Sequence, residues 1–159
     1  MNRFDCGANP LNVFLKNKAK SRSKRLEYKV VVATLDGSPN CIGYYALQVG
    51  SDSIPESSKY KQKDYATNYP AFPAINLTYL AVQGQGLGEY LLNHIFAAVG
   101  IMVEHVGFYA LTVQSFDEKS TKFYEKIGFK EYSEGGGQPK MLYPVTSIIQ
   151  ILENHPQRN

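Results

Sequence analysis

The sequence predicts one mixed α/β domain over residues 1–159, and three observations favour this fold class. Two β-rich segments, residues 27–34 and 41–49, flank a turn-forming sequence at residues 36–40, which predicts a hairpin. An alternating and then wholly apolar segment at residues 75–82 runs into a glycine-rich loop and an amphipathic helical pattern. A chain of 159 residues with 43% hydrophobic content suits one domain with a single core.

The N-terminal part of the chain predicts one short helix. Asn9 can accept hydrogen bonds from the first helical amides, and Pro10 has no amide that would need a partner there. We expect the apolar stripe of this helix to be buried, with basic side chains on its other face. The residues of that stripe are Leu11, Phe14, Leu15 and Ala19.

Two further helices and a strand are predicted after the glycine-rich loop. Apolar residues at helical spacing predict an amphipathic helix over residues 87–106, and residues 108–114 read as the next strand. Asp117 is a helix-capping residue, and Gly128 is typical of a left-handed helix end. These two signals predict a short helix over residues 118–127.

Two segments give weaker patterns. Residues 140–151 are rich in apolar and β-branched side chains and predict a last strand. Residues 51–70 are polar and serine-rich, and a connection of this length is usually functional or mobile.

Composition and cysteine usage exclude several classes of protein. No apolar run approaches the roughly 18 to 20 residues of a membrane helix, and the first residues lack the order of a secretory signal. Cys6 and Cys41 are too few for a disulfide framework, and with three scattered histidines they offer no zinc-binding spacing. We therefore expect a cytoplasmic protein with reduced thiols, no metal and no membrane association.

The charge of the chain is unevenly distributed. Six basic residues fall within ten positions that contain no acidic residue, whereas the remaining 11 basic residues face all 14 acidic ones. Such a basic cluster attracts polyanions, most commonly nucleic acid phosphates, although it is also typical of a solubilising face. The cluster consists of Lys16, Lys18, Lys20, Arg22, Lys24 and Arg25.

The glycine-rich loop between the strand at residues 75–82 and the following helix is the strongest chemical signal. The first amides of a helix lack internal partners and attract anions, and glycines let a phosphate approach them. Glu89 and Tyr90 follow Gly88, so the lysine and hydroxyl residue of an ATP-binding loop are absent. The spacing also fails the dinucleotide pattern. It fits Q-x-x-G-x-G, or else a tight turn.

This loop resembles the pyrophosphate loop of the GNAT acetyltransferases, and other segments are similar to one branch of that family. The likeness runs over roughly residues 4–143. Its landmarks, in chain order, are Phe4-Asp5-Cys6-Gly7, Leu11 with Phe14-Leu15, Ile42-Gly43-Tyr44-Tyr45-Ala46-Leu47, Leu80-Ala81-Val82, Phe123-Tyr124-Glu125 and Gly128-Phe129. The branch contains the toxins of type II toxin-antitoxin systems, which acetylate the amino group of aminoacyl-tRNA.

The resemblance implies a fold, a co-substrate and partners. The fold would be a twisted, mostly antiparallel sheet flanked by helices. It would splay between its fourth and fifth strands, here residues 75–82 and 108–114. Acetyl-coenzyme A (acetyl-CoA) would bind in that opening and no metal would be needed. Aminoacyl-tRNA would be the substrate, translation would be inhibited, and a cognate antitoxin would bind the protein. Dimerisation is common in the family.

The resemblance also implies the roles of individual residues. Tyr124 would be the catalytic acid, because a phenol with a pKa of about 10 keeps its proton at neutral pH. The alternative is that this tyrosine only anchors its helix in the core, a role expected rather of Phe123. The basic cluster would hold RNA phosphates. Backbone amides around the strand end and the loop would bind acetyl-CoA, at Leu80, Ala81, Val82, Gln83, Gly84, Gln85, Gly86, Leu87 and Gly88.

Two departures from the family pattern keep other functions open. About four residues usually separate the strand end from the loop glutamine, and here Val82 directly precedes Gln83. Tyr79 stands where the family often has arginine. The alternatives are therefore an N-acetyltransferase acting on a small amine or a protein, which Tyr79 favours, and a non-catalytic remnant, which the short junction favours.

Overall fold

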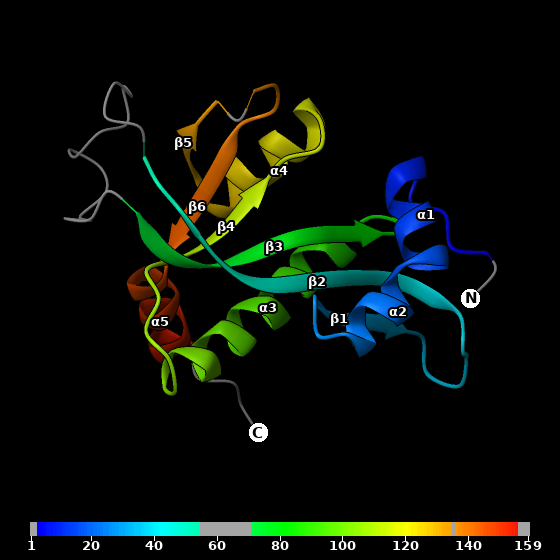
Figure 1. The fold of residues 1–159 in the computed structure, drawn as a ribbon. Coiled ribbons are helices and arrows are strands. Elements are labelled where there is room, and N and C mark those ends of the chain that lie inside the picture. The colour runs from blue at the N-terminus through cyan, green and yellow to red at the C-terminus, as the bar shows by residue number, and fades with distance from the viewer. Residues whose placement is uncertain (1–2, 55–70, 135, 156–159) are drawn as a thin grey trace. The chain divides into compact units, whose positions relative to one another are not determined.

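A computed structural model of the chain describes residues 3–54, 71–134 and 136–155 (Figure 1). The chain contains both helices and strands, as expected of the mixed α/β class, and the strands form a six-stranded sheet in the order β1-β2-β3-β4-β6-β5. In chain order the elements are α1 (Asn9–Asn17), α2 (Ala19–Lys24), β1 (Lys29–Thr34), β2 (Cys41–Asp52), β3 (Phe72–Val82), α3 (Leu87–Val103), β4 (Ala110–Gln114), α4 (Glu118–Ile127), β5 (Lys130–Ser133), β6 (Lys140–Pro144) and α5 (Val145–Asn154).

The chain divides into two compact units. The first contains Met1–Gln48 and Leu77–Ile95, and the second contains Val49–Asn76 and Phe96–Asn159. Strands β2 and β3 each contribute residues to both units.

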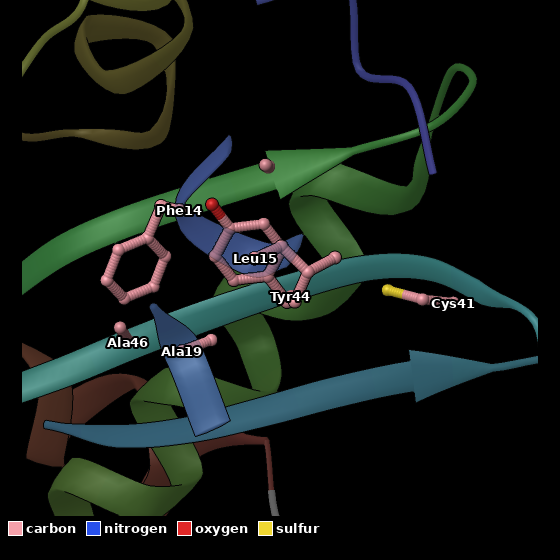
Figure 2. Close-up of a cluster of buried hydrophobic side chains, with 7 residues drawn as sticks. Phe14, Leu15, Ala19, Cys41, Tyr44 and Ala46 are labelled. Atoms are coloured by element: carbon pink, nitrogen blue, oxygen red, sulfur yellow. The ribbon is translucent and has the colours of Figure 1, made fainter. Parts of the chain in front are cut away.

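In the first unit, the predicted hairpin is confirmed. Strands β1 and β2 pair antiparallel from Lys29 opposite Leu47 to Thr34 opposite Cys41, with a bulge at the Ala33–Thr34 step. Helices α1 and α2 bury their apolar residues with side chains of β2 and β3, and Figure 2 shows this cluster. Its buried members are Phe14, Leu15, Ala19, Cys41, Tyr44, Ala46 and Ala81.

The start of α3 packs closely on β2 because of one small residue. A Cβ atom built on Gly43 would lie 3.1 Å from side-chain atoms of both Leu87 and Leu91, and 3.3 Å from the carbonyl oxygen of Ala81. Glycine at this position therefore allows the first turns of α3 to approach the hairpin. The packing fixes the first turn of α3 against β2, directly after the glycine-rich loop.

In the second unit, local signals place the short helix α4 as the sequence predicts. The Asp117 carboxylate accepts a 2.8 Å hydrogen bond from the Ser120 amide, and the Ser120 hydroxyl accepts one of 2.9 Å from the Asp117 amide. Gly128 ends the helix in the left-handed conformation, with its amide donating to the carbonyls of Tyr124 and Glu125. Strand β6 pairs antiparallel with both β4 and β5.

Three expectations from the sequence are wrong. The predicted single N-terminal helix is two short helices, α1 and α2, and α1 begins at Asn9 itself, with Ala8 as its N-cap. Strand β5 was not predicted, because its four residues are too few to show a pattern. The predicted loop at residues 51–70 begins later, since β2 extends to Asp52, and from position 55 to position 70 it lies outside the described residues.

The predicted last strand at residues 140–151 is also wrong. Only β6, Lys140–Pro144, is extended, and Val145 begins helix α5. Pro144 is the last residue of β6 and also the N-cap of α5, and proline has no amide with which to continue the strand ladder. The following residues bury Val145 and Ile148 at helical spacing, a stripe that an apolar run also permits.

The described ranges contain neither a membrane-spanning helix nor a metal-binding group. Within residues 3–54, 71–134 and 136–155, no helix is long and apolar enough to cross a bilayer. The same ranges contain no group of three or more histidine, cysteine, aspartate or glutamate side chains able to hold a metal ion.

An ionic cluster joins β2, β5 and β6 of the second unit and makes a prediction about acid stability. The Asp52 carboxylate accepts hydrogen bonds from the Tyr132 hydroxyl at 2.6 Å and from the Lys140 ammonium at 3.0 Å. Burial raises the pKa of Asp52, but the hydrogen bonds from Tyr132, the Ser53 amide and Lys140 outweigh burial, so its pKa lies below the usual value.

A lowered pKa in the folded state means that Asp52 stabilises the fold above its unfolded pKa of about 3.9 and loses this effect as pH falls through the lower folded value. We therefore expect Asp52→Asn to lower the free energy of unfolding by about 1 kcal/mol at pH 7, because the cluster is partly exposed. Urea denaturation at several pH values should show this difference shrinking between pH 5 and pH 3. A difference that stays constant over that range would contradict the role of the carboxylate.

Candidate functional site

The glycine-rich loop forms a short, exposed bend between β3 and α3. Gln83 to Gly86 are exposed, and α3 begins at Leu87. Gly84 and Gly86 have φ angles of +100° and +82°, which side-chain-bearing residues rarely adopt. No atom lies within 4 Å of a Cβ built on either glycine, so the surface at both positions is open.

The loop leaves backbone amides available for a ligand. The Gln83 amide is used by the sheet, since it donates a 2.8 Å hydrogen bond to the Ile42 carbonyl. Among the residues that the structure describes, the amides of Gly84, Gln85 and Gly86 have no backbone acceptor. The amides of Leu87 and Gly88 open α3, where helix geometry supplies no acceptor. Five consecutive amides at the positive end of a helix dipole are a suitable site for a diphosphate.

The strand end that precedes the loop is partly in the core. Ala81 is 4% exposed and belongs to the cluster around Phe14, whereas Leu80 and Val82 are half-buried. The Ala81 side chain therefore serves packing, and any contact of residues 80–82 with a ligand would come from their backbone. These residues and the loop are contiguous and lie in the same unit.

Tyr124 lies on α4 in the second unit, so it belongs to a different unit from the loop. Its side chain is 5% exposed, and its ring packs edge-on against Phe123 and Phe129 at centroid distances of 5.3 Å. The expectation that Phe123 takes the core position is wrong, because Phe123 is only half-buried. Tyr124 is the residue that anchors this helix.

The burial of Tyr124 affects its chemistry. Burial raises the pKa of its hydroxyl far above the usual value of about 10. The phenol is therefore fully protonated at neutral pH and is able to donate a hydrogen bond.

The basic cluster lies on α1, α2 and the residues that flank them, in the same unit as the loop. Lys16, Lys18, Lys20 and Lys24 are exposed. Arg22 and Arg25 are instead paired with one acidic residue: the Glu27 carboxylate lies 3.5 Å from the Arg22 guanidinium and 2.7 Å from that of Arg25. The four lysines are therefore suited to long-range attraction of phosphates, whereas Glu27 holds the two arginines in fixed positions.

The pairing with Glu27 depends on a turn that the sequence did not reveal. Leu26 has a φ angle of +59°, which is rare for a residue with a side chain, and it is 90% exposed. This turn lets the Glu27 amide donate to the Arg22 carbonyl at 3.0 Å and brings the glutamate back over α2. In the sequence, only the short separation of Arg22 and Glu27 points to this ion pair.

A cavity elsewhere contains none of the predicted site residues. It has a volume of about 480 Å³ and lies between the C-terminal half of α3 and α5 of the second unit, with Ile101 and Leu152 among its lining. Its lining is mainly apolar and includes the acidic residues Glu104 and Glu153. Such a lining does not suit a phosphate ligand, whereas the backbone amides of the loop do.

The proteins similar to this chain are known from solved structures. No protein-family model matches the chain, and no curated protein is similar to it in sequence. Solved structures are similar along nearly its whole length. A tyrosine-to-phenylalanine mutant of KacT is 32% identical, with a TM-score of 0.81, over 93% of this chain and 89% of that one.

Structures of AtaT are also similar. AtaT complexed with acetyl-methionyl-tRNAfMet is 28% identical, with a TM-score of 0.80, over 95% of this chain and 91% of that one. A mutant AtaT toxin bound to the C-terminus of the antitoxin AtaR and acetyl-CoA is 25% identical. Its TM-score is 0.77, over 96% of this chain and 89% of that one.

The mixed six-stranded sheet, the flanking helices and the open amides before α3 define an acyltransferase of the GNAT class. More particularly, the chain belongs to the GNAT toxins of type II toxin-antitoxin systems, the family of AtaT and KacT.

Adding a single methyl group at Gly86 tests whether a ligand needs the open surface there. We expect Gly86→Ala to weaken acetyl-CoA binding at least about ten-fold, because the methyl would occupy the space through which a diphosphate reaches the amides. Isothermal titration calorimetry measures this directly. The matched control is Gly37→Ala in the β1–β2 turn, where φ is +75° and no atom lies within 4 Å of the built Cβ.

Both alanine variants should lower the free energy of unfolding by a similar amount, about 1 kcal/mol, because both glycines have positive φ angles. Equal acetyl-CoA affinity in the two variants would show that the loop does not bind the diphosphate.

Proposed function

We propose that residues 1–159 form one N-acetyltransferase domain, a toxin that transfers the acetyl group of acetyl-CoA to the α-amino group of aminoacyl-tRNA and so blocks translation. The observation that carries this proposal is the likeness, over 95% of the chain, to AtaT complexed with acetyl-methionyl-tRNAfMet. The open amides of the loop and the exposed lysines of α1 and α2 support it. A protein that acts on tRNA works in the cytoplasm, and we propose that location.

The residues of the loop fit acetyl-CoA as co-substrate. The amides of residues 84–88 would bind its diphosphate, and the backbone of residues 80–82 would orient the thioester. When bound, acetyl-CoA supplies an activated acyl group with a thiolate leaving group. Holding an amine beside a thioester raises the effective concentration of the two groups, so positioning accounts for much of the acceleration.

The substrate amine needs little help from a base. An α-amino group has a pKa of about 7.7 to 8.0, so a useful fraction is neutral at cellular pH. During transfer, the nitrogen forms a bond to the acyl carbon, the carbon–sulfur bond breaks, and the proton that leaves the nitrogen is balanced by the proton that the sulfur gains. No metal and no redox partner enters this balance.

The proposed role of Tyr124 follows from its protonation state. Burial raises the pKa of its hydroxyl well above that of a thiol, which is about 8.5. Such a phenol holds its proton more tightly than the thiol does, so its main contribution is a hydrogen bond to the developing thiolate. The phenol then stabilises negative charge on sulfur while the proton from the amine completes the product thiol.

The exposed lysines of α1 and α2 have two proposed partners. They would hold phosphates of the tRNA acceptor stem during catalysis. In the absence of RNA, a cognate antitoxin would cover the same basic surface with acidic residues, consistent with the complex of AtaT with the C-terminus of AtaR.

The role of the phenol can be tested by removing its oxygen atom. We expect Tyr124→Phe to lower kcat for acetylation of aminoacyl-tRNA by about 10² to 10³, because one positioned proton donor is lost. The assay follows transfer of label from acetyl-CoA into the tRNA fraction of total aminoacylated tRNA. The control Tyr109→Phe removes a half-buried phenol of the same unit and should leave kcat unchanged.

Acetyl-CoA affinity should be unchanged in Tyr124→Phe, which separates loss of chemistry from loss of fold. Full activity of Tyr124→Phe would contradict the proposed hydrogen bond from the phenol to the sulfur. Label found only in small amines or in protein, and never in RNA, would instead support the other substrate classes.

The phosphate contacts can be tested by salt dependence. Binding of tRNA should weaken as salt rises, and the double variant Lys18→Ala/Lys20→Ala should reduce the slope of log K against log salt by about one for each lysine. Filter binding between 50 and 300 mM salt gives these slopes. The control Lys130→Ala removes an exposed lysine on β5 and should not change the slope. An unaltered slope in the double variant would rule out the proposed phosphate contacts.

A further inference from the structure

Aromatic side chains of the first unit form a stack beside the basic cluster. The ring of Tyr79 on β3 lies parallel to that of Phe14 on α1, with centroids 3.8 Å apart. Tyr28, just before β1, approaches Tyr79 edge-on at 6.0 Å and Phe14 edge-on at 5.9 Å. Phe14 also stacks on Tyr44 at 6.0 Å, and Figure 2 shows these two rings side by side. The four rings therefore form one rigid group.

The four rings differ in exposure. Phe14 and Tyr44 are buried and form the base of the group, and Tyr28 and Tyr79 are half-buried and form its rim. Phe14 is 3% exposed and Tyr44 is fully buried, so neither ring is accessible to a ligand. Tyr28 and Tyr79 are half-buried, so part of each residue is accessible to solvent. The buried rings hold the two tyrosines in place, and a ligand meets a preformed aromatic surface.

A cation completes the rim. The Arg22 guanidinium lies 5.8 Å from the centre of the Tyr28 ring and donates a hydrogen bond of 3.4 Å to its hydroxyl. Burial raises the pKa of Tyr79, the neighbouring Tyr28 raises it further, and the charge of Arg22 lowers it, so Arg22 acts on both tyrosines. The Glu27 carboxylate lies 3.5 Å from the same guanidinium nitrogen of Arg22 that donates to Tyr28.

The position of this group relates it to the proposed chemistry. Tyr79 directly precedes the strand end at residues 80–82, which leads into the loop. The exposed Lys18 lies between α1, which carries Phe14, and α2, which carries Lys20 and Arg22. Aromatic faces next to fixed cations are the combination that binds single-stranded nucleic acid, because bases stack on the rings and phosphates pair with the cations.

We propose that Tyr79, Tyr28 and Arg22 form the docking site for the unpaired 3′ end of the RNA substrate. The terminal base stacks on the exposed parts of the two tyrosines, and Arg22 contacts the adjoining phosphate. This inference rests on the proposed function for the choice of RNA. It adds residues that recognise the single-stranded end of the RNA. The lysines on α1 and α2 contact phosphates and do not distinguish this end.

The geometry favours an RNA end over an apolar peptide. Tyrosine hydroxyls and a guanidinium line the rim, and both give polar contacts to a base, a ribose or a phosphate. An apolar side chain would make no use of the Arg22 donors that Glu27 and Tyr28 leave available.

The experiment is a double-mutant cycle with deacylated tRNA, either intact or lacking its terminal adenosine, and without acetyl-CoA. For the wild-type protein, removal of the adenosine should weaken binding about ten-fold, the size of one base-stacking contact. For Tyr79→Leu, intact and shortened tRNA should bind equally, because the stacking partner is absent. Tyr79→Phe keeps the ring and should retain most of the ten-fold difference.

Two further variants complete the design. Phe14→Leu removes the buried partner of Tyr79 and controls for lost packing: its melting temperature should fall, but the difference between the two RNAs should persist. Arg22→Gln should weaken binding of both RNAs and reduce the salt slope by about one.

An equal loss of affinity for both RNAs in Tyr79→Leu would overturn the inference, as would a loss of acetyl-CoA binding in that variant. The cycle measures binding and not acetylation, so the docking site and the proposed acetyltransferase function can fail independently of each other. A chain that acetylates tRNA but shows no coupling to the terminal adenosine refutes only the docking site. Coupling without acetylation refutes only the proposed function.

Discussion

The amides left without acceptors before the first turn of α3 are the constraint on which the rest of the site depends. They exist because β3 pairs with β2 up to the Gln83 amide, while α3 is fixed against Gly43 of the same hairpin. Only residues 83–86 separate the strand from the helix, so the chain bends sharply with positive φ angles at Gly84 and Gly86. The short junction therefore still forms a bend that exposes amides to an anion.

The role of each basic residue in the cluster depends on whether it is paired with an acidic residue. Six basic residues are close in sequence, but Glu27 pairs with two of them and holds Arg22 beside Tyr28. The remaining lysines are exposed and suited to long-range attraction of a polyanion. A fixed guanidinium beside aromatic rings gives local recognition instead. Helices α1 and α2 thus provide both non-specific attraction and a defined contact.

Local signals were predicted well from the sequence, and contacts between distant residues were not. The cap at Asp117, the left-handed end at Gly128 and the turn at residues 36–40 depend on a few neighbouring residues, and all three occur. The stack of Tyr79 on Phe14 joins residues 65 positions apart, and no spacing rule reveals it. Helix α5 was missed because an apolar, β-branched run suits a strand as well as a buried helix.

For the site, the sequence predicted the loop and its open amides, because glycine spacing directly reflects backbone geometry. It misjudged Tyr124 and Phe123, since adjacent aromatic residues on a helix leave open which of them faces the core. The neutralisation of Arg22 and Arg25 by Glu27 required the unusual backbone at Leu26, which is not a residue type that marks such turns.

The central claim is that the backbone amides of residues 84–88 bind the diphosphate of acetyl-CoA. Amide chemical shifts in ¹⁵N NMR spectra of the protein, titrated with non-reactive desulfo-coenzyme A, test it most directly. The account predicts large, saturable shifts at the amides of Gly84, Gly86 and Gly88, and none at Gly37. Saturable binding that leaves these three amides unshifted would contradict it.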